Sequence, residues 1–133
     1  MEKVKNTAPS MDAWIKEAKA DESAAECGMY LFHNGIVRQS AKAKVRQGDN
    51  EASDVKGMVF SFDAEKVKKA VEKARKMPGI GYVRAWLNEG RLEVGDDIML
   101  VLVGGDIRPH VIAALQELVG ELKNYCVKEE ELF

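Results

Sequence analysis

Basic side chains near the start of a predicted helix have the types and spacing to bind an anionic substrate. Arg108 and His110 follow Gly104-Gly105 and an apolar run. Free backbone N–H groups at a helix start attract anions, and arginine adds a forked donor that matches phosphate or carboxylate. Glycine lets a ligand approach the backbone closely. These residues predict an anion site, although a structural turn with exposed Arg and His side chains explains them equally well.

Lys123 and Lys128 lie at the far end of the same predicted helix and just beyond it. Lys123 follows the apolar Leu122 and is expected at the boundary between core and solvent. A lysine amine in a partly desolvated cleft can act as a base or a nucleophile. We therefore predict Lys123 and Lys128 as candidate catalytic residues of one pocket. The alternative is a pair of lysines that favour the helix dipole and solubility.

Two further basic residues belong to the first predicted strand, 28–37, or follow it directly. Arg38 follows it and either reaches a ligand at the sheet edge or is simply exposed. His33 lies inside it and is expected to be a hydrogen-bonded structural residue. Neither histidine belongs to a Cys/His cluster, so the sequence supports no metal site and no Ser/His/Asp triad. The glycine spacing before Arg108 is not that of a Walker or Rossmann loop, so nucleotide binding is not supported.

The hydrophobic pattern predicts the elements that position these residues. In the segment 64–76, apolar residues recur at helical spacing after the capping residue Asp63. Together, the patterns predict helices over 11–20, 64–76 and 109–125, and strands over 28–37, 57–62, 81–87, 91–94 and 97–103. This order predicts an α+β domain with helices packed on a mostly antiparallel sheet.

Three polar segments lie outside this framework. Residues 1–9 are predicted to be a disordered tail, which leaves 10–133 as a single domain. The segment 38–56 is predicted to be a mobile loop. Its basic residues alternate and form either a basic strip or a solvated loop; they are Lys42, Lys44 and Arg46. The C-terminal KEEELF is either tucked into a groove or available to a partner.

Composition narrows the possible classes of protein. The 133 residues carry a formal net charge of −2, without the basic surplus that indicates nucleic-acid binding. Two cysteines are too few for a disulfide framework. The N-terminus has no apolar signal region, and the longest apolar run, 98–103, is too short to cross a membrane. We expect a cytoplasmic protein that needs no cofactor and binds neither nucleic acid nor membrane.

Four segments, taken in order, resemble the large, catalytic subunit of molybdopterin synthase. They are GMYLFHNGIVR (28–38), MVFSFDAEKVKKAVEKA (58–74), GRLEVGDDIMLVLVGG (90–105) and IRPHVIAALQELVGELK (107–123). The resemblance covers about residues 28–130. It implies an α/β hammerhead-like fold with a small extra β subdomain, and a homodimer.

The resemblance also implies a reaction and its partners. A small ubiquitin-like sulfur-carrier subunit inserts its C-terminal Gly-Gly, as a thiocarboxylate, into the large subunit. Sulfur then moves in two rounds to a pterin phosphate, cyclic pyranopterin monophosphate, and forms the dithiolene of molybdopterin. By position, Arg38 and Arg108 would hold the phosphate, Lys123 would be the catalytic lysine and Lys128 the second lysine.

The sequence departs from the family pattern at several positions. Ile107 stands where the family has His, with His110 nearby as a substitute, and 87–90 lacks the basic pair of the family's His-Arg-Ile-Gly. These departures support a second hypothesis, a non-catalytic paralogue that binds a ubiquitin-like partner or acts as a regulatory or structural dimer. A third is an unrelated structural domain that dimerises through its sheet edges.

Overall fold

The computed structural model describes residues 4–41, 48 and 53–133. The helical elements are α1 (Met11–Ala20), the 3-10 helix η1 (Glu22–Glu26), α3 (Ala64–Arg75), α4 (Arg108–Glu121) and the π-helical turn η2 (Leu122–Cys126). The strands are β1 (Met29–Ile36), β2 (Gly57–Phe62), β3 (Ile80–Leu87), β4 (Gly90–Glu93), β5 (Asp97–Gly105) and β6 (Val127–Leu132).

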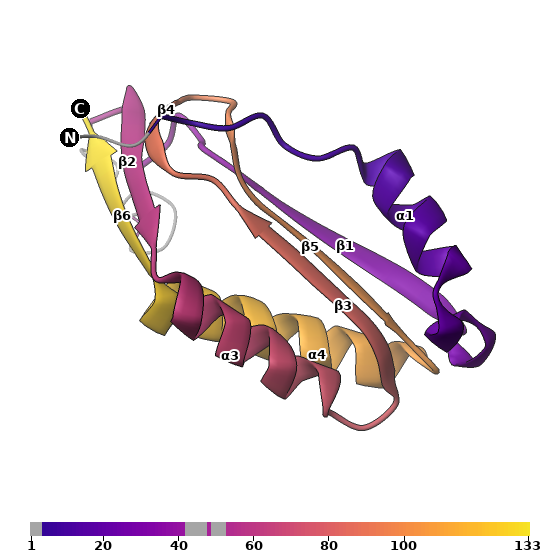
Figure 1. The fold of residues 1–133 in the computed structure, drawn as a ribbon. Helices are drawn as coiled ribbons and strands as arrows, with labels where there is room; N and C mark the ends of the chain where they lie inside the picture. The colour runs from indigo at the N-terminus through magenta and orange to yellow at the C-terminus, as the bar shows by residue number, and fades with distance from the viewer. Residues whose placement is uncertain (1–3, 42–47, 49–52) are drawn as a thin grey trace.

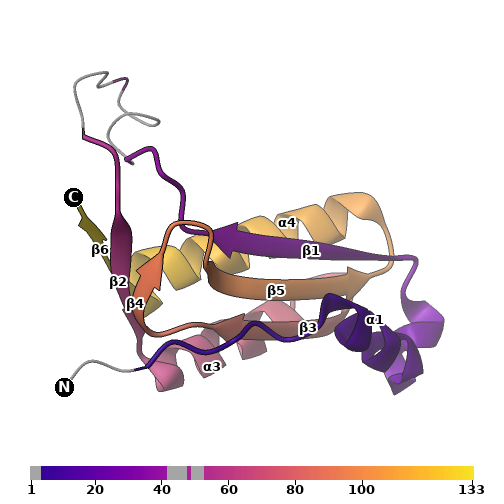
Figure 2. The ribbon, with the colours of Figure 1, turned by 90° about the horizontal axis from the view of Figure 1, so that it is seen from above.

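The strands form two antiparallel sheets. The long sheet has the order β1-β5-β3, and the small sheet has the order β4-β2-β6. Figures 1 and 2 show α3 and α4 along one face of the long sheet, α1 on the other face, and the small sheet at one end. The prediction of an α+β domain with helices on antiparallel strands is confirmed.

Strand β5 forms the centre of the core because both of its faces are covered. Alternate side chains of a strand point to opposite faces. Val101 and Val103 pack in the cluster that includes Leu118 of α4, whereas Leu100 and Leu102 pack with Trp14 of α1. This apolar strand runs as far as Gly105, so it places the start of α4 at one end of the long sheet.

The C-terminal segment forms a strand that the sequence analysis did not predict. Strand β6 pairs with β2 in antiparallel register from Gly57↔Leu132 to Phe62↔Val127. The N–H of Lys56 also donates to the carbonyl of Leu132 at 2.6 Å. Of the two alternatives left open for this segment, the structure therefore shows a segment tied into the fold.

The predicted loop 38–56 is anchored at both ends. Ala41 and Val55 are buried, and the N–H of Val55 donates to the carbonyl of Gln39 at 2.7 Å. The predicted basic strip of Lys42, Lys44 and Arg46 lies outside the described residues.

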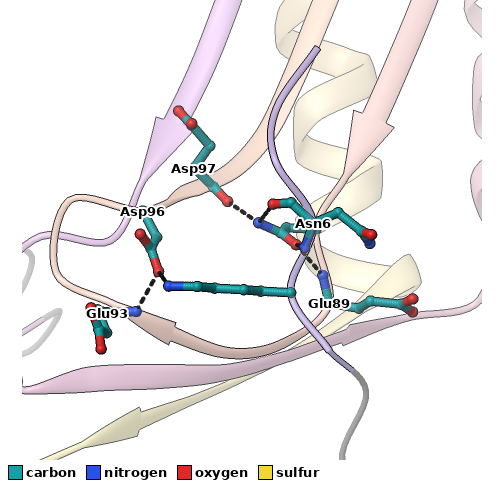
Figure 3. Close-up of polar contacts among 7 residues, drawn as sticks. Asn6, Glu89, Glu93, Asp96 and Asp97 are labelled. Atoms are coloured by element: carbon teal, nitrogen blue, oxygen red, sulfur yellow. Dashed lines mark hydrogen bonds and ion pairs between the residues drawn. The ribbon is translucent and has the colours of Figure 1, made fainter.

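Residues 4–8, named here the N-terminal strap, are hydrogen-bonded to the connections between the two sheets (Figure 3). The Asn88 side chain, which is 2% exposed, accepts from the N–H of Asn6 at 2.7 Å and donates to the carbonyls of Asn6 and Asp97 at 3.0 and 2.8 Å. Lys5 donates to Asp96 at 2.8 Å. The sequence predicts a disordered tail over residues 1–9; within it, Lys5 and Asn6 make these hydrogen bonds to the rest of the fold.

Candidate functional site

A small cavity at the boundary of the two sheets brings together two of the predicted site residues, Arg38 and Lys123. We name it the Lys123 pocket; its lining residues are Ile36, Arg38, Met58, Ile98, Lys123, Glu129 and Glu131. Its volume is about 30 Å³, which is enough to hold a water molecule. A larger cavity of about 390 Å³ lies along β3 and includes Asp21 and Arg75, but none of the predicted site residues.

The charges of the Lys123 pocket are close to balanced. Lys123 Nζ lies 3.2 Å from Oε1 of Glu129, and the two side chains are 27% and 6% exposed. Glu131 adds a second carboxylate to the lining, and Arg38 adds a second cation. Arg38 is exposed, and its Nε donates to the carbonyl of Ser40 at 2.9 Å. An anionic ligand that binds Lys123 must therefore compete with Glu129.

The π-helical turn η2 sets the position of Lys123. It continues directly from α4, and turns of this kind are frequent at functional sites. The buried Leu122 and Cys126 fix the turn on the core, and Lys123 lies between them at the core boundary, as predicted. Burial raises the pKa of the Cys126 thiol, so this thiol stays protonated and is not a nucleophile at neutral pH.

His33 lies near Lys123, although the sequence indicated only a structural residue. Its Nε2 atom is buried and has no hydrogen-bond partner within the described ranges. Its pKa is lowered first by burial and then by the positive charge of Lys123. The imidazole is therefore neutral at pH 7.

Lys128 lies on the opposite face of β6 from the pocket. Side chains alternate along this strand, and Glu129 and Glu131 face the Lys123 pocket. Lys128 is exposed and its backbone is in register with Ser61 of β2. Within one chain, the structure does not bring Lys128 and Lys123 into the same cavity.

Arg108 and His110 lie at the opposite end of α4 from Lys123. Lys123 follows Arg108 by fifteen positions, which corresponds to about 22 Å along a helix. Nδ1 of His110 lies 2.7 Å from Oδ1 of Asp106, and this contact is the main reason that the pKa of Asp106 is lowered. Oδ1 of Asp106 also accepts from the N–H of Ile107 at 2.6 Å. Asp106, which was not among the predicted site residues, is the carboxylate that pairs with His110 just before α4 begins.

The described residues give no indication of a metal site or a membrane span. No group of three or more His, Cys, Asp or Glu side chains in this part of the chain could hold a metal ion. Within the same ranges, every helix is too short or too polar to cross a bilayer.

The sequence profile of the family described as MoaE protein matches residues 4–125. The fold is similar to the crystal structure of molybdopterin synthase from Staphylococcus aureus, with a TM-score of 0.71 at 15% identity over 96% of this chain and 88% of that chain. It is also similar to molybdopterin cofactor biosynthesis protein E from Burkholderia multivorans, with a TM-score of 0.70 at 20% identity over 95% and 82%.

A third solved structure is a complex of subunits 1 and 2 of molybdopterin-converting factor from Helicobacter pylori. One chain of it matches with a TM-score of 0.65 at 18% identity over 95% of this chain and 80% of that chain. No curated protein sequence matches. At these identities, the solved structures establish the fold of the chain.

Proposed function

Because the chain belongs to the MoaE family, we propose that it acts in molybdenum cofactor biosynthesis as the large subunit of a molybdopterin synthase. In this role it transfers sulfur from a small ubiquitin-like subunit, as a C-terminal thiocarboxylate, to cyclic pyranopterin monophosphate. The observation that carries the proposal is the Lys123 pocket, in which the lysine and arginine implied by the resemblance lie together. The similarity to a two-subunit complex supports the small partner.

Each cation of the pocket has a separate role in this proposal. Arg38 is exposed at the rim, where a guanidinium can bind the phosphate of the pterin with two N–H donors. Lys123 is more enclosed and assists the sulfur transfer. A cavity of about 30 Å³ is too small for a pterin. Substrate binding therefore requires the pocket to open and Glu129 to release Lys123.

We further propose a homodimer that brings Arg108 and His110 to the Lys123 pocket of the partner subunit. A two-fold axis across α4 would place each Arg108 beside the other subunit's Lys123, because the two residues lie at opposite ends of one helix. In this arrangement Ile112 faces Val119 of the partner subunit, because both pairs are centred on the same point of α4, between residues 115 and 116. Ile112 is 39% exposed and Val119 is half-buried, so α4 offers apolar surface where the second helix would pack.

The function is tested by a single-turnover assay with the purified protein, a thiocarboxylated small subunit and the pterin precursor. Dithiolene product is the expected result. If the small subunit binds and no product forms, the chain is the non-catalytic paralogue instead, a reading favoured by the Lys123–Glu129 ion pair that closes the pocket. If neither binding nor product is found, both functions are excluded.

The homodimer predicts complementation between two inactive variants. Lys123→Met and Arg108→Ala damage different ends of α4, so a mixed dimer of the two contains one intact pocket made from both chains. Co-refolded variants should regain about a quarter of wild-type turnover, because half of the dimers are mixed and each has one working site of two. If both residues serve the same subunit, mixing restores no activity.

A further inference from the structure

The side chain of His33 has a buried ring nitrogen, Nε2, without a hydrogen-bond partner among the described residues. His33 belongs to β1, and its strand neighbour Leu31 packs against the core cluster that includes Leu122. Side chains two apart on a strand share a face, so His33 also faces the α4 side of the long sheet. Nε2 is buried and has no partner in the residues that the structure describes. A buried polar atom without a hydrogen bond is costly and needs an explanation.

The surroundings of Nε2 show where a partner can come from. Gly35 lies beside it: a Cβ atom at Gly35 would be 3.7 Å from Nε2 and 3.8 Å from Cβ of Ile98, which lines the Lys123 pocket. The positive charge of Lys123 also acts on the imidazole. These observations place His33 next to residues that line the Lys123 pocket, with a glycine rather than a larger side chain beside Nε2.

The identity of the partner follows from hydrogen-bond chemistry. The imidazole is neutral, so one ring nitrogen carries the proton and the other accepts. A lysine ammonium only donates, and it has three N–H groups. Glu129 takes one of these groups in the present structure. When the imidazole carries its proton on Nδ1, the lone pair of Nε2 can accept a hydrogen bond from one of the remaining N–H groups of Lys123.

We propose that His33 is a positioning residue for Lys123: its Nε2 accepts a hydrogen bond from the Lys123 amine when an anionic substrate draws Lys123 away from Glu129. This inference rests on the proposed function and adds a residue to it. The contact holds the amine toward the substrate and satisfies the buried nitrogen. The other charged groups of the site are Arg38, Glu129 and Glu131. None of them replaces His33, since Arg38 cannot accept and the two carboxylates compete for the same amine.

Two substitutions separate positioning from simple packing. His33→Phe keeps a buried ring and removes the acceptor, whereas His33→Gln keeps an acceptor at a similar distance from the backbone. We expect His33→Phe to lower kcat about tenfold or more, because a hydrogen bond to a charged group is lost, with little change in KM. His33→Gln should stay within about threefold of wild type. Equal turnover in all three proteins would overturn the proposal.

The pH dependence of kcat separates the two roles, because a residue that only packs in the core does not add a titration to this profile. Protonated His33 cannot accept from an ammonium, so wild-type kcat should fall on the acid side as His33 binds a proton, and this limb should be absent in His33→Gln. The low pKa of folded His33 also reduces stability as pH falls below the unfolded value of about 6.5, because the unfolded state then binds more protons. Turnover is therefore compared only where circular dichroism shows folded protein.

A measurement without turnover keeps this inference distinct from the proposed function. In ¹⁵N NMR spectra, His33 should show the tautomer protonated on Nδ1, and Lys123→Met should raise its titration midpoint because a nearby positive charge is gone. An unchanged midpoint, or the opposite tautomer, would refute the role of His33 even in an active enzyme. Correct NMR behaviour in a protein that gives no product would instead contradict the proposed function.

Discussion

Replacing Lys123 with methionine is expected to lower the rate of sulfur transfer by at least about 100-fold. Methionine has a similar length and keeps the contacts of the side-chain stem, but it has no amine to move protons or attack an electrophile, and positioned groups of this kind contribute about 10²–10⁴-fold. Single-turnover product formation measures the effect. Affinity for the small subunit should be nearly unchanged, because the partly enclosed amine acts on the reacting atoms rather than on docking.

Lys128→Met is the matched control, because it removes the same charge from the other face of β6. Turnover within about threefold of wild type is expected. The melting temperature of Lys123→Met has to be compared as well, since Glu129 loses one partner and is nearly buried. Wild-type turnover in a folded Lys123→Met protein would remove Lys123 from the mechanism, and a large loss in Lys128→Met would support the second lysine predicted from the sequence.

Asn88→Ala is expected to lower the free energy of unfolding by about 2–4 kcal/mol, since the loss of the amide leaves several backbone groups without partners at 1–3 kcal/mol each. The Asn88 side chain makes four hydrogen bonds, to both backbone groups of Asn6, to the carbonyl of Asp97 and to the N–H of Glu89. Urea denaturation followed by circular dichroism measures the change. Because Asn88 is buried, few water molecules can replace these bonds.

Asn6→Ala is the control for this prediction. The strap contributes the backbone N–H and carbonyl of residue 6, so the side chain of Asn6 is not part of the contact. A change of less than about 0.5 kcal/mol is expected, as for other substitutions away from buried contacts. Similar losses in both variants would show that Asn88 does not act through the backbone of the strap.

Strong local patterns explain which parts of the fold could be predicted from the sequence. The helix after Asp63 begins as predicted, since the Asp63 side chain accepts from the N–H groups of Glu65 and Lys66. Strand β6 was missed because three consecutive acids are unfavourable in an isolated strand. Pairing with β2 decides its structure, and this long-range context overrides local propensity. The order of the N-terminal strap depends on Asn88, more than 80 residues away, for which no local signal exists.

The candidate site could be predicted in part. The sequence correctly identified Lys123 as a residue at the core boundary, but its proximity to Arg38 depends on how two sheets meet, and the resemblance alone suggested it. In β6, Glu129 points toward Lys123 and Lys128 points to the other face. This alternation could not be predicted, because the sequence analysis had not identified the segment as a strand. His33 belongs to no motif, and only the folded chain shows that its Nε2 has no hydrogen-bond partner among the described residues.

The strap has a mechanical consequence for the Lys123 pocket. One wall of the pocket comes from the long sheet, through Ile36 and Ile98, and the other from the small sheet, through Met58 and Glu129. The two short links around Asn88 and Asp96 connect these sheets, and the strap is hydrogen-bonded to both links (Figure 3). Loss of these contacts, as in Asn88→Ala, removes hydrogen bonds that hold the two links together through the strap. We therefore expect the hydrogen bonds of the N-terminal strap to influence the width of a pocket whose lining residues lie far from the strap in the sequence.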